Sequence, residues 1–265
     1  MREGKQVRNA REHNSLKSVE RALQILEAFT LDQYELTTTE IAQKVSLPKG
    51  SIYRFLNVLL KRRFLVKDPQ TGKYRLGIKV FELGSIVWKG MSLRRVAFPL
   101  IEELSRWSGE TVHLGVRDGY EVVSIEGTES DQSLRTVLPV GKRVCLHSTG
   151  IGKAILAFLP DKEFEEIIEQ KGLPVFTPNT IRDRDRLWEE VRTIRNRGYA
   201  VDNEENEMGV RCVAAPIRDH SGQVIASISI SGPSIRITDE KIPSLARRVI
   251  EVCKAISESL GYKGE

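Results

Sequence analysis

One short stretch of the chain gathers basic and polar residues at the spacing of a single helix face. Between Ile52 and Leu59, apolar residues recur three and four positions apart, which predicts one buried face of a helix. The opposite face would present side chains that bond to phosphates and base edges, and such a helix can lie in a DNA major groove. An ordinary helical hairpin with a solvated polar face is the alternative. The residues predicted on the polar face or at its entry are Lys49, Gly50, Ser51, Tyr53, Arg54, Asn57 and Lys61.

Thiol catalysis is a second chemistry to weigh. Cys145 and His147 stand two apart on a predicted extended segment, so their side chains would share a face. Cys212 together with a histidine is another pairing. A nucleophilic cysteine needs a base within hydrogen-bond reach and a further group that orients this base. No nucleophile-elbow pattern accompanies these residues, so we do not expect an enzyme, and thiol catalysis at Cys145 and His147 stays the alternative to a binding function.

A metal site is a third possibility, because His147, Asp202 and Cys212 are residue types that bind metals. Ligands this far apart give no spacing signature, and the sequence has no CxxC pair. We therefore expect neither a metal nor another cofactor. Cys145, Cys212 and Cys253 are odd in number and widely spaced, which argues against a disulfide scaffold and fits a reducing cytoplasm.

The polar helix is preceded by another helix and a tight turn. Thr37 and Glu40 form a T-x-x-E capping box, which predicts a helix start. Thr39, near that start, is placed to bond a phosphate. Pro48 breaks the pattern and suits the first turn of the next helix, because its missing N–H is not needed there. The stretch Thr37–Arg63 therefore predicts a helix-turn-helix.

A basic hairpin follows directly. Two short runs of strand-forming residues flank a Pro- and Gly-containing turn at residues 68–72, which predicts a β-hairpin. Alternation would put Tyr74 and Leu76 on one face of the hairpin. Lys73 and Arg75 would lie on the other face, against phosphates or a minor groove. A helix-turn-helix followed by such a hairpin is a winged helix.

Two further helices are predicted around this module. Residues 18–30 show one apolar stripe, so this helix would complete a three-helix core. Residues 77–90 are apolar on more than one stripe, which predicts a linker helix that packs on a second subunit as well as on its own domain. A helix buried within one domain would give the same pattern.

Charge is unevenly distributed over the 265 residues. Residues 1–95 hold 19 Lys and Arg against 9 Asp and Glu, whereas the rest of the chain holds 22 against 27. A basic N-terminal third joined to a mildly acidic remainder indicates a nucleic-acid module joined to another domain. Residues 1–14 are charged and lack an apolar segment, so we expect a loose basic tail and no secretory signal. No apolar run reaches membrane-spanning length, and we expect a cytoplasmic protein that binds no membrane.

The remainder, from about Ser92, predicts a second domain of mixed helices and strands. Asp118-Gly119, between two alternating segments, is a strong hairpin signal. Gly198 is placed to end a long amphipathic helix, and residues 138–146 are expected to be extended. The strands would form an antiparallel sheet with helices on one or both sides, so the chain is predicted to be α+β.

Several motifs together resemble the IclR family of bacterial transcription regulators, from about Ser15 to Leu260. In the N-terminal part they are SVERALQILEAF, TEIAQKVSLPKGSIYRFLNVL and GKYRLG; in the C-terminal part they are LHSTGIGKAILAFLP and GYAVDNEENEMGVRCVAAPIRDHSGQVIASISISGP. Two positions depart from the family pattern. Arg218 stands where an aromatic residue or histidine is usual, and Gly50 stands where serine is common.

The resemblance implies a C-terminal domain similar to a GAF domain that holds a small-molecule effector. Ser229 and Ser231 are two apart on a predicted strand, so both hydroxyls can donate to one anion. Gly150 opens a predicted helix, where free N–H groups favour a carboxylate. Because the set has no Arg or Lys, it suits a small carboxylate better than a phosphate; the alternative is that these are ordinary residues of a sheet core. The implied pocket residues are Gly150, Ile151, Asp202, Cys212, Ser229 and Ser231.

The resemblance also implies function and assembly. We expect a ligand-responsive regulator whose winged helices, paired in a homodimer or homotetramer, bind a pseudo-palindromic DNA operator. A repressor of a catabolic operon is the default for the family, and a transcriptional activator is the alternative. The expected domains are a winged helix-turn-helix over residues 15–77, a linker helix over 78–91 and an effector-binding domain over 92–265.

Overall fold

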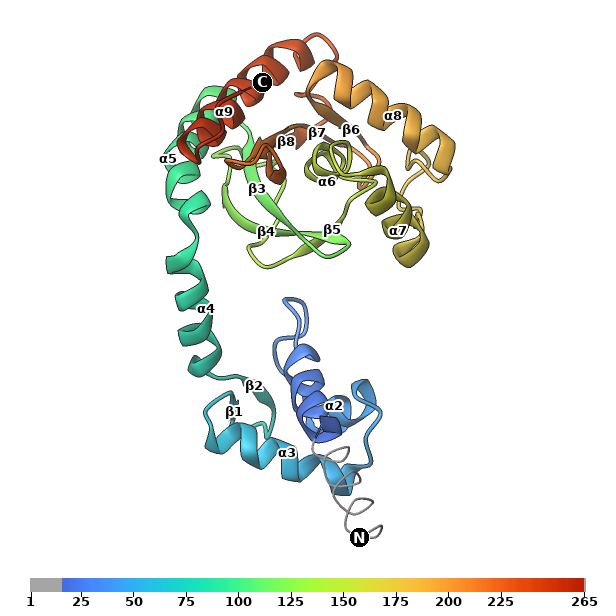
Figure 1. Ribbon diagram of the computed structural model, residues 1–265. Helices are drawn as coiled ribbons and strands as arrows, with labels where there is room; N and C mark the ends of the chain where they lie inside the picture. Colours follow the sequence, from blue (N-terminus) through green and yellow to red (C-terminus); the bar gives the residue numbers. More distant parts are fainter. Residues whose placement is uncertain (1–15, 265) are drawn as a thin grey trace, which may run out of the picture. The chain divides into compact units, whose positions relative to one another are not determined.

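Figure 1 shows the computed structural model, which describes residues 16–264. The chain divides into two compact units, and the division falls between Gly90 and Met91. Each unit has a hydrophobic core of its own. The basic tail expected over residues 1–14 lies outside the described residues.

The N-terminal unit is a small helical module with a two-stranded hairpin. A helix over residues 16–27 packs with the next two helices around buried side chains that include Ile25, Ile41 and Leu56. This is the winged helix-turn-helix that the sequence predicts. The other elements of the unit are α2 (Thr38–Lys44), α3 (Lys49–Lys61), β1 (Leu65–Lys67), β2 (Tyr74–Leu76) and α4 (Ile78–Gly90).

Local signals explain how this module is held together. The Thr37 hydroxyl accepts from the N–H of Glu40 at 3.3 Å, and the Glu40 carboxylate accepts from the N–H of Thr37 at 2.7 Å, so the predicted capping box is present. Pro48 is the N-cap of α3 and does not lie inside its first turn. Leu36 pairs with Tyr74 through N–O distances of 2.9 and 2.7 Å. The segment before α2, which shows no strand pattern in the sequence, therefore anchors the hairpin to the helices.

The helix α4 has no buried residue. Its apolar side chains are exposed in this single chain, with Phe81 at 69% and Ile86 at 70% exposure. The helix is therefore not buried within its own domain, and its packing on a second subunit stays a prediction. An apolar surface of this kind is typical of an interaction site.

The C-terminal unit is built on one six-stranded antiparallel sheet, in the order β5-β4-β3-β8-β7-β6. With helices packed on this sheet, the class is α+β as predicted. The strands are β3 (Thr111–Asp118), β4 (Glu121–Thr128), β5 (Arg143–Cys145), β6 (Ala200–Asn203), β7 (Val210–Arg218) and β8 (Val224–Pro233). The helices are α5 (Ser92–Ser108), α6 (Gly150–Leu156), α7 (Asp161–Lys171), α8 (Arg184–Arg197) and α9 (Ile242–Ser259).

Helices cover both faces of this sheet (Figure 1). The helices α5 and α9 pack together on one face, over a core that includes Leu114, Ile228 and Ile230. On the other face α6 packs with α7 and α8 in a second core. The strand β8 alternates between the two faces, because its isoleucines enter the first core whereas Ser229 and Ser231 point toward α6.

The segment before α6 is less regular than the sequence predicts. Only Arg143–Cys145 of the expected extended stretch 138–146 forms a strand. A turn precedes it, in which the N–H of Lys142 donates to the carbonyl of Pro139 at 3.1 Å. Gly141 sits in this turn with φ +87°, a conformation that glycine adopts without strain. The turn therefore limits β5 to a short edge strand.

Candidate ligand cavity and nucleic-acid interface

A cavity of about 90 Å³ lies in the C-terminal unit between α6 and the sheet. All the residues predicted to bind an effector line it: Gly150, Ile151, Asp202, Cys212, Ser229 and Ser231. The structure thus brings together residues that stand up to 81 positions apart in the sequence. The lining residues that the sequence analysis missed are His113, Thr136, Val137, Leu138, Val144, Thr149, Asn206, Glu207 and Val210.

Strand pairing explains how these side chains meet. Asp202 on β6 pairs with Cys212 on β7. Cys212 pairs in turn with Ser231 on β8, and Ser231 pairs with Thr111 on β3. Paired residues on neighbouring strands point to the same face of a sheet. The four side chains therefore form one polar row across four strands.

A second row lies two residues along the strands. His113 on β3 pairs with Ser229 on one side and with Gly127 of β4 on the other. A Cβ added to Gly127 would lie 3.1 Å from His113 Nδ1, so glycine leaves room for the ring. The two rows meet at the hydroxyls of Ser229 and Ser231, whose oxygens are 3.1 Å apart. His113 is buried, and its Nδ1 has no hydrogen-bond partner among the described residues.

The chain enters α6 through a tight, capped turn. The Thr149 hydroxyl accepts from the N–H of Gly152 at 3.1 Å and donates to the carbonyl of Cys145 at 2.7 Å. A Cβ on Gly152 would lie 2.3 Å from that same carbonyl oxygen, so only glycine fits. At Gly150 a Cβ would lie 3.0 Å from the Cβ of Cys212. Gly152 therefore lets α6 begin close against the segment that precedes it, and Gly150 lets α6 approach β7 closely.

Burial favours the neutral forms of three lining residues, Asp202, Cys212 and His113. It raises the pKa of Asp202 to about 7, and the N–H of Glu205, which donates to Asp202 at 2.8 Å, offsets this only in part. Burial also raises the pKa of the Cys212 thiol well above its ordinary value and lowers the pKa of His113 to about 4. Near pH 7 the thiol and the imidazole are uncharged and Asp202 is about half protonated. These three groups would therefore present little net charge to a ligand, and the other acidic side chain of the lining is the exposed Glu207.

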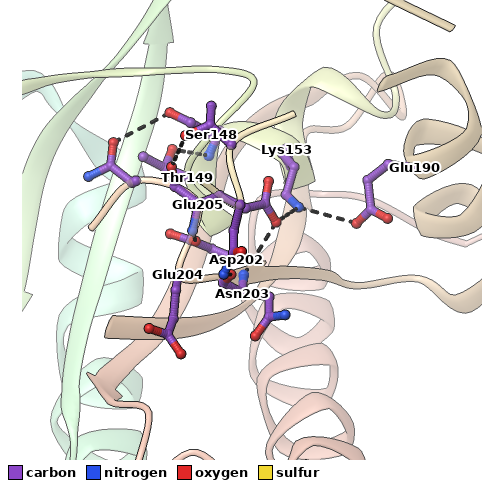
Figure 2. Close-up of polar contacts among 12 residues, drawn as sticks. Ser148, Thr149, Lys153, Glu190, Asp202, Asn203, Glu204 and Glu205 are labelled. Atoms are coloured by element: carbon purple, nitrogen blue, oxygen red, sulfur yellow. Dashed lines mark hydrogen bonds and ion pairs between the residues drawn. The ribbon is translucent and has the colours of Figure 1, made fainter. Parts of the chain in front are cut away.

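An ion cluster centred on Lys153 lies next to the cavity, and Figure 2 shows its side chains. The ammonium group of Lys153, on α6, lies between two carboxylates, 2.5 Å from Glu205 Oε1 and 3.3 Å from Glu190 Oε1. Lys153 is only 1% exposed. Glu205 belongs to the loop between β6 and β7 and bonds through its N–H to Asp202. The cluster therefore ties this loop, which carries Asn206 and Glu207 of the lining, to α6.

Different signals could have revealed the missed residues. Asn206 and Glu207 lie in the same signature stretch as Asp202, so the motif could have indicated that this loop also lines the pocket. His113 sits on the polar side of an alternating strand, but its pairing with Ser229 follows only from the order of strands in the sheet. The partners of Lys153 come from α8 and a loop, and no local pattern predicts such contacts.

The second predicted site lies on the surface of the N-terminal unit. Ile52 and Leu56 of α3 are fully buried, whereas the opposite side of the helix is exposed, with Tyr53 at 50%. A Cβ on Gly50 would meet no atom within 4 Å. The side chain of Lys49 lies outside what the structure describes. The remaining predicted contacts divide into exposed residues, Gly50, Tyr53, Arg54, Asn57 and Arg75, and half-buried ones, Thr39, Ser51 and Lys73.

The structure also shows where the residues considered for thiol catalysis and for metal binding lie. β5 ends at Cys145, so His147 lies beyond the strand on which both were expected. Nε2 of His147 lies 3.0 Å from the carbonyl oxygen of Pro174, to which it donates. His147 also lines a different cavity from Asp202 and Cys212. Within residues 16–264 no group of three His, Cys, Asp or Glu side chains is placed to hold a metal ion.

No helix among the described residues is both long and apolar enough to cross a membrane.

Comparisons with known proteins agree over nearly the whole chain. The model "Bacterial transcriptional regulator IclR C-terminal" matches residues 86–258, and "IclR helix-turn-helix domain" matches residues 18–69. The chain is 38% identical over 247 residues to the HTH-type transcriptional regulator XynR of Escherichia coli K12, covering 93% of this chain and 98% of XynR. It is 36% identical over 247 residues to the HTH-type transcriptional repressor AllR of the same strain, covering 93% and 91%. A solved structure of an IclR homolog from Microbacterium hydrocarbonoxydans, complexed with 4-hydroxybenzoate, matches with a TM-score of 0.81 and 26% identity, over 92% of this chain and 98% of that one.

Proposed function

Because this chain belongs to the IclR family of bacterial transcriptional regulators and is a ligand-responsive DNA-binding regulator, we propose that the cavity beside α6 binds its effector, a small aliphatic carboxylate. The observation that carries this proposal is the polar row of Asp202, Cys212 and Ser231 in the cavity. The proposed effector-binding residues are the six predicted ones, joined by His113 and Thr149.

The chemistry of the lining favours a ligand that carries a single negative charge. The hydroxyls of Ser229 and Ser231 are 3.1 Å apart and can both donate to one carboxylate. Protonated Asp202 can donate as well, because its pKa of about 7 keeps much of it neutral. Among the described residues no Lys or Arg lines the cavity. A phosphate dianion would lack a positive partner there, and burying unpaired charge is costly.

The size of the cavity further limits the acids that can bind. Its volume of about 90 Å³ is smaller than the ~150 Å³ of an apolar cavity that accommodates benzene. Short hydroxy and oxo acids fit this volume. A ring-bearing acid such as 4-hydroxybenzoate, with which the Microbacterium hydrocarbonoxydans homolog is complexed, would require the cavity to widen.

On the DNA side, the exposed face of α3 is the proposed major-groove contact. Arg54 would bond a base edge or a close phosphate, and Tyr53 and Asn57 are exposed on the same helix. Arg75 on β2 would contact phosphate from the wing. Lys49, Gly50, Ser51, Thr39 and Lys73 complete the proposed set.

The exposed apolar side chains of α4 support the proposed assembly. A second copy of this chain would cover Phe81 and Ile86, which are at least 69% exposed, and would bring two winged helices into one dimer. A two-fold dimer reads a pseudo-palindromic operator. Pairing of C-terminal units would extend the dimer to a tetramer.

The sign of regulation is proposed by similarity. AllR is a transcriptional repressor, so we infer repression of a catabolic operon, released or strengthened by the effector. An activator is the alternative. We also infer a cytoplasmic protein without catalytic activity, which should leave a bound acid chemically unchanged.

Thermal unfolding against a panel of acids tests the effector class. The panel should include glycolate, lactate, pyruvate, malate, benzoate, 4-hydroxybenzoate and inorganic phosphate. A ligand at about 100 times its Kd adds about 2.7 kcal/mol to the stability of the domain that binds it. We expect a two- to four-carbon acid to raise Tm, and phosphate to have no effect.

Matched variants locate the binding site. Ser229→Ala/Ser231→Ala removes both hydroxyls without changing the backbone, and should abolish the shift given by the best acid. Ser221→Ala, in an exposed turn outside the cavity, is the control and should keep it. A shift that survives in the double variant would place the acid elsewhere and refute the proposed pocket.

A further inference from the structure

A second and larger cavity lies on the other side of the segment that leads into α6. Its volume is about 180 Å³, and it opens between this segment, α7, α8 and the turn joining β3 to β4. Val144 lines the effector cavity, whereas Cys145 and Leu146 line this one. The two cavities are therefore separate but share one strand as a wall.

The walls of the second cavity are mostly apolar. Leu156, Ile167 and Leu187 come from three helices and are buried. The charged groups at the rim are Lys171 and Glu121, whose side chains are 44% and 28% exposed and whose N–O distance is 3.1 Å. Because this ion pair balances itself, the cavity offers no net charge to a ligand.

One buried polar side chain remains free to bond to an occupant. His147 is only 4% exposed and lines the cavity. Its Nε2 donates to the carbonyl of Pro174 at 3.0 Å, so Nδ1 of the neutral ring is an acceptor, and no described residue donates to it. Burial lowers the pKa of His147 and raises that of the Cys145 thiol, so both groups are neutral near pH 7.

We propose that this second cavity is an accessory ligand site for a small neutral aromatic molecule that carries one hydroxyl group, of the phenol class. The volume of about 180 Å³ exceeds the ~150 Å³ that accommodates benzene, and the hydroxyl would donate to Nδ1 of His147. A carboxylate would have no free cation to pair with. The proposal stands apart from the effector site, which takes an anion and has half this volume.

Alkylation of cysteines by iodoacetamide, followed peptide by peptide by mass spectrometry, tests the site in the full-length protein. Cys145 lines the second cavity, and Cys212 lines the effector cavity, so each thiol reports on one site. We expect saturating phenol to slow alkylation of Cys145 at least fivefold and to leave Cys212 unchanged. Benzoate should not protect Cys145. Unchanged alkylation of Cys145 with phenol present, or protection of Cys212 alone, would overturn the proposal.

Calorimetric titration with two variants provides the second test. Ile168→Trp places a large side chain at the half-buried edge of the cavity and should abolish phenol binding, with the fold checked by circular dichroism. His147→Phe removes the acceptor and should weaken phenol by roughly threefold to tenfold, the value of one hydrogen bond, without weakening benzene. Phenol binding of wild-type strength in folded Ile168→Trp protein would overturn the site, and equal losses for phenol and benzene in His147→Phe would overturn the role of His147.

Discussion

The exposed face of α3 and the cavity beside α6 both carry polar side chains, but water reaches them very differently. Arg54, Asn57 and Arg75 are exposed in the N-terminal unit. Asp202 and Ser231 are buried in the C-terminal unit, where Asp202 has a pKa of about 7. The proposed DNA-binding surface keeps its full charges in solvent, whereas the proposed anion cavity offers neutral donors.

The two regions also differ in how their residues are held. On α3 each side chain is placed by the helix alone, and no other polar side chain has to be in position. In the cavity, a side chain is placed by the pairing of β6, β7, β8 and β3 and by the ion cluster of Lys153, Glu190 and Glu205. Substitutions in the cavity region should therefore affect stability and binding together, and substitutions on α3 should affect binding alone.

The largest expected effect is on the buried ion cluster. Lys153→Met keeps the aliphatic stem but leaves the buried carboxylate of Glu205 without its cation, and should lower the free energy of unfolding by about 3–5 kcal/mol. Urea unfolding measures the loss. Lys153→Met/Glu205→Gln, which removes the unpaired charge as well, should recover part of it. If Lys153→Met were as stable as wild type, the cluster would not support the cavity wall.

The next prediction concerns a substitution that should weaken DNA binding without changing the stability of the fold. Arg54→Ala should weaken operator binding by about 1–3 kcal/mol and leave urea unfolding unchanged. The measurement is fluorescence anisotropy with duplexes that the wild-type protein selects from a random pool, repeated at several salt concentrations. If Arg54 bonds a phosphate, the slope of log K against log salt also falls by about one. Unchanged affinity would remove Arg54 from the interface.

The pH dependence of effector binding tests the neutral character of the cavity. Above pH 7, Asp202 ionises, stops donating and repels a carboxylate, so affinity for the acid should fall by up to about tenfold per pH unit. Below pH 7 it should level off. Asp202→Asn keeps a donor at every pH and should flatten the profile, as calorimetric titration between pH 6 and pH 8.5 would show. A wild-type profile without a fall above pH 7 would contradict the assignment.

The raised pKa of Asp202 also predicts the direction in which stability changes with pH. Its pKa is raised in the native state from the ordinary 3.8 to about 7, so the native state holds its proton at pH values where the unfolded chain has released it. The free energy of unfolding should therefore fall as pH rises through that window, and Asp202→Asn should remove this part of the fall.

We expect the smallest change in stability from an alanine substitution at Gly50, which is compared with the same substitution at Gly152. A Cβ on Gly50 meets no atom within 4 Å, so Gly50→Ala should raise stability by about 0.5–1 kcal/mol through helix propensity. A Cβ on Gly152 would lie 2.3 Å from the carbonyl oxygen of Cys145, so Gly152→Ala should destabilise the protein. Thermal unfolding of both variants measures the contrast. A Gly152→Ala protein as stable as the wild type would mean that α6 is not packed as closely as the structure has it.

The sequence predicts local structure better than it predicts partners across the sheet. The capping box at Thr37, the buried face of α3 and the glycine that ends α8 follow from short patterns, and the structure confirms them. The family, the α+β class and the regulatory function are confirmed as well. The pocket residues were reached through family motifs and line one cavity, but their roles in binding stay predictions.

Most of the features that the sequence did not predict depend on contacts between distant segments. His113 gains its place beside Ser229 from the neighbouring positions of β3 and β8, two strands far apart in the chain. Leu36 pairs with Tyr74 without any strand pattern of its own. The expected extended stretch before α6 is cut short by a turn at Pro139 and Gly141. In the first two cases the decisive contact joins residues far apart in the sequence, whereas the turn before α6 is local and depends on Pro139 and Gly141.

Whether the effector cavity controls DNA binding is tested most directly by operator affinity with and without the best acid, for the wild-type protein and for Ser229→Ala/Ser231→Ala. We expect the acid to change the wild-type Kd for the operator by about 5- to 150-fold, a typical coupling between two sites. The double variant should bind the operator like wild-type protein without acid and should not respond to the acid. An equal response in both proteins, or no response in wild-type protein that demonstrably binds the acid, would contradict the claim that this cavity controls DNA binding.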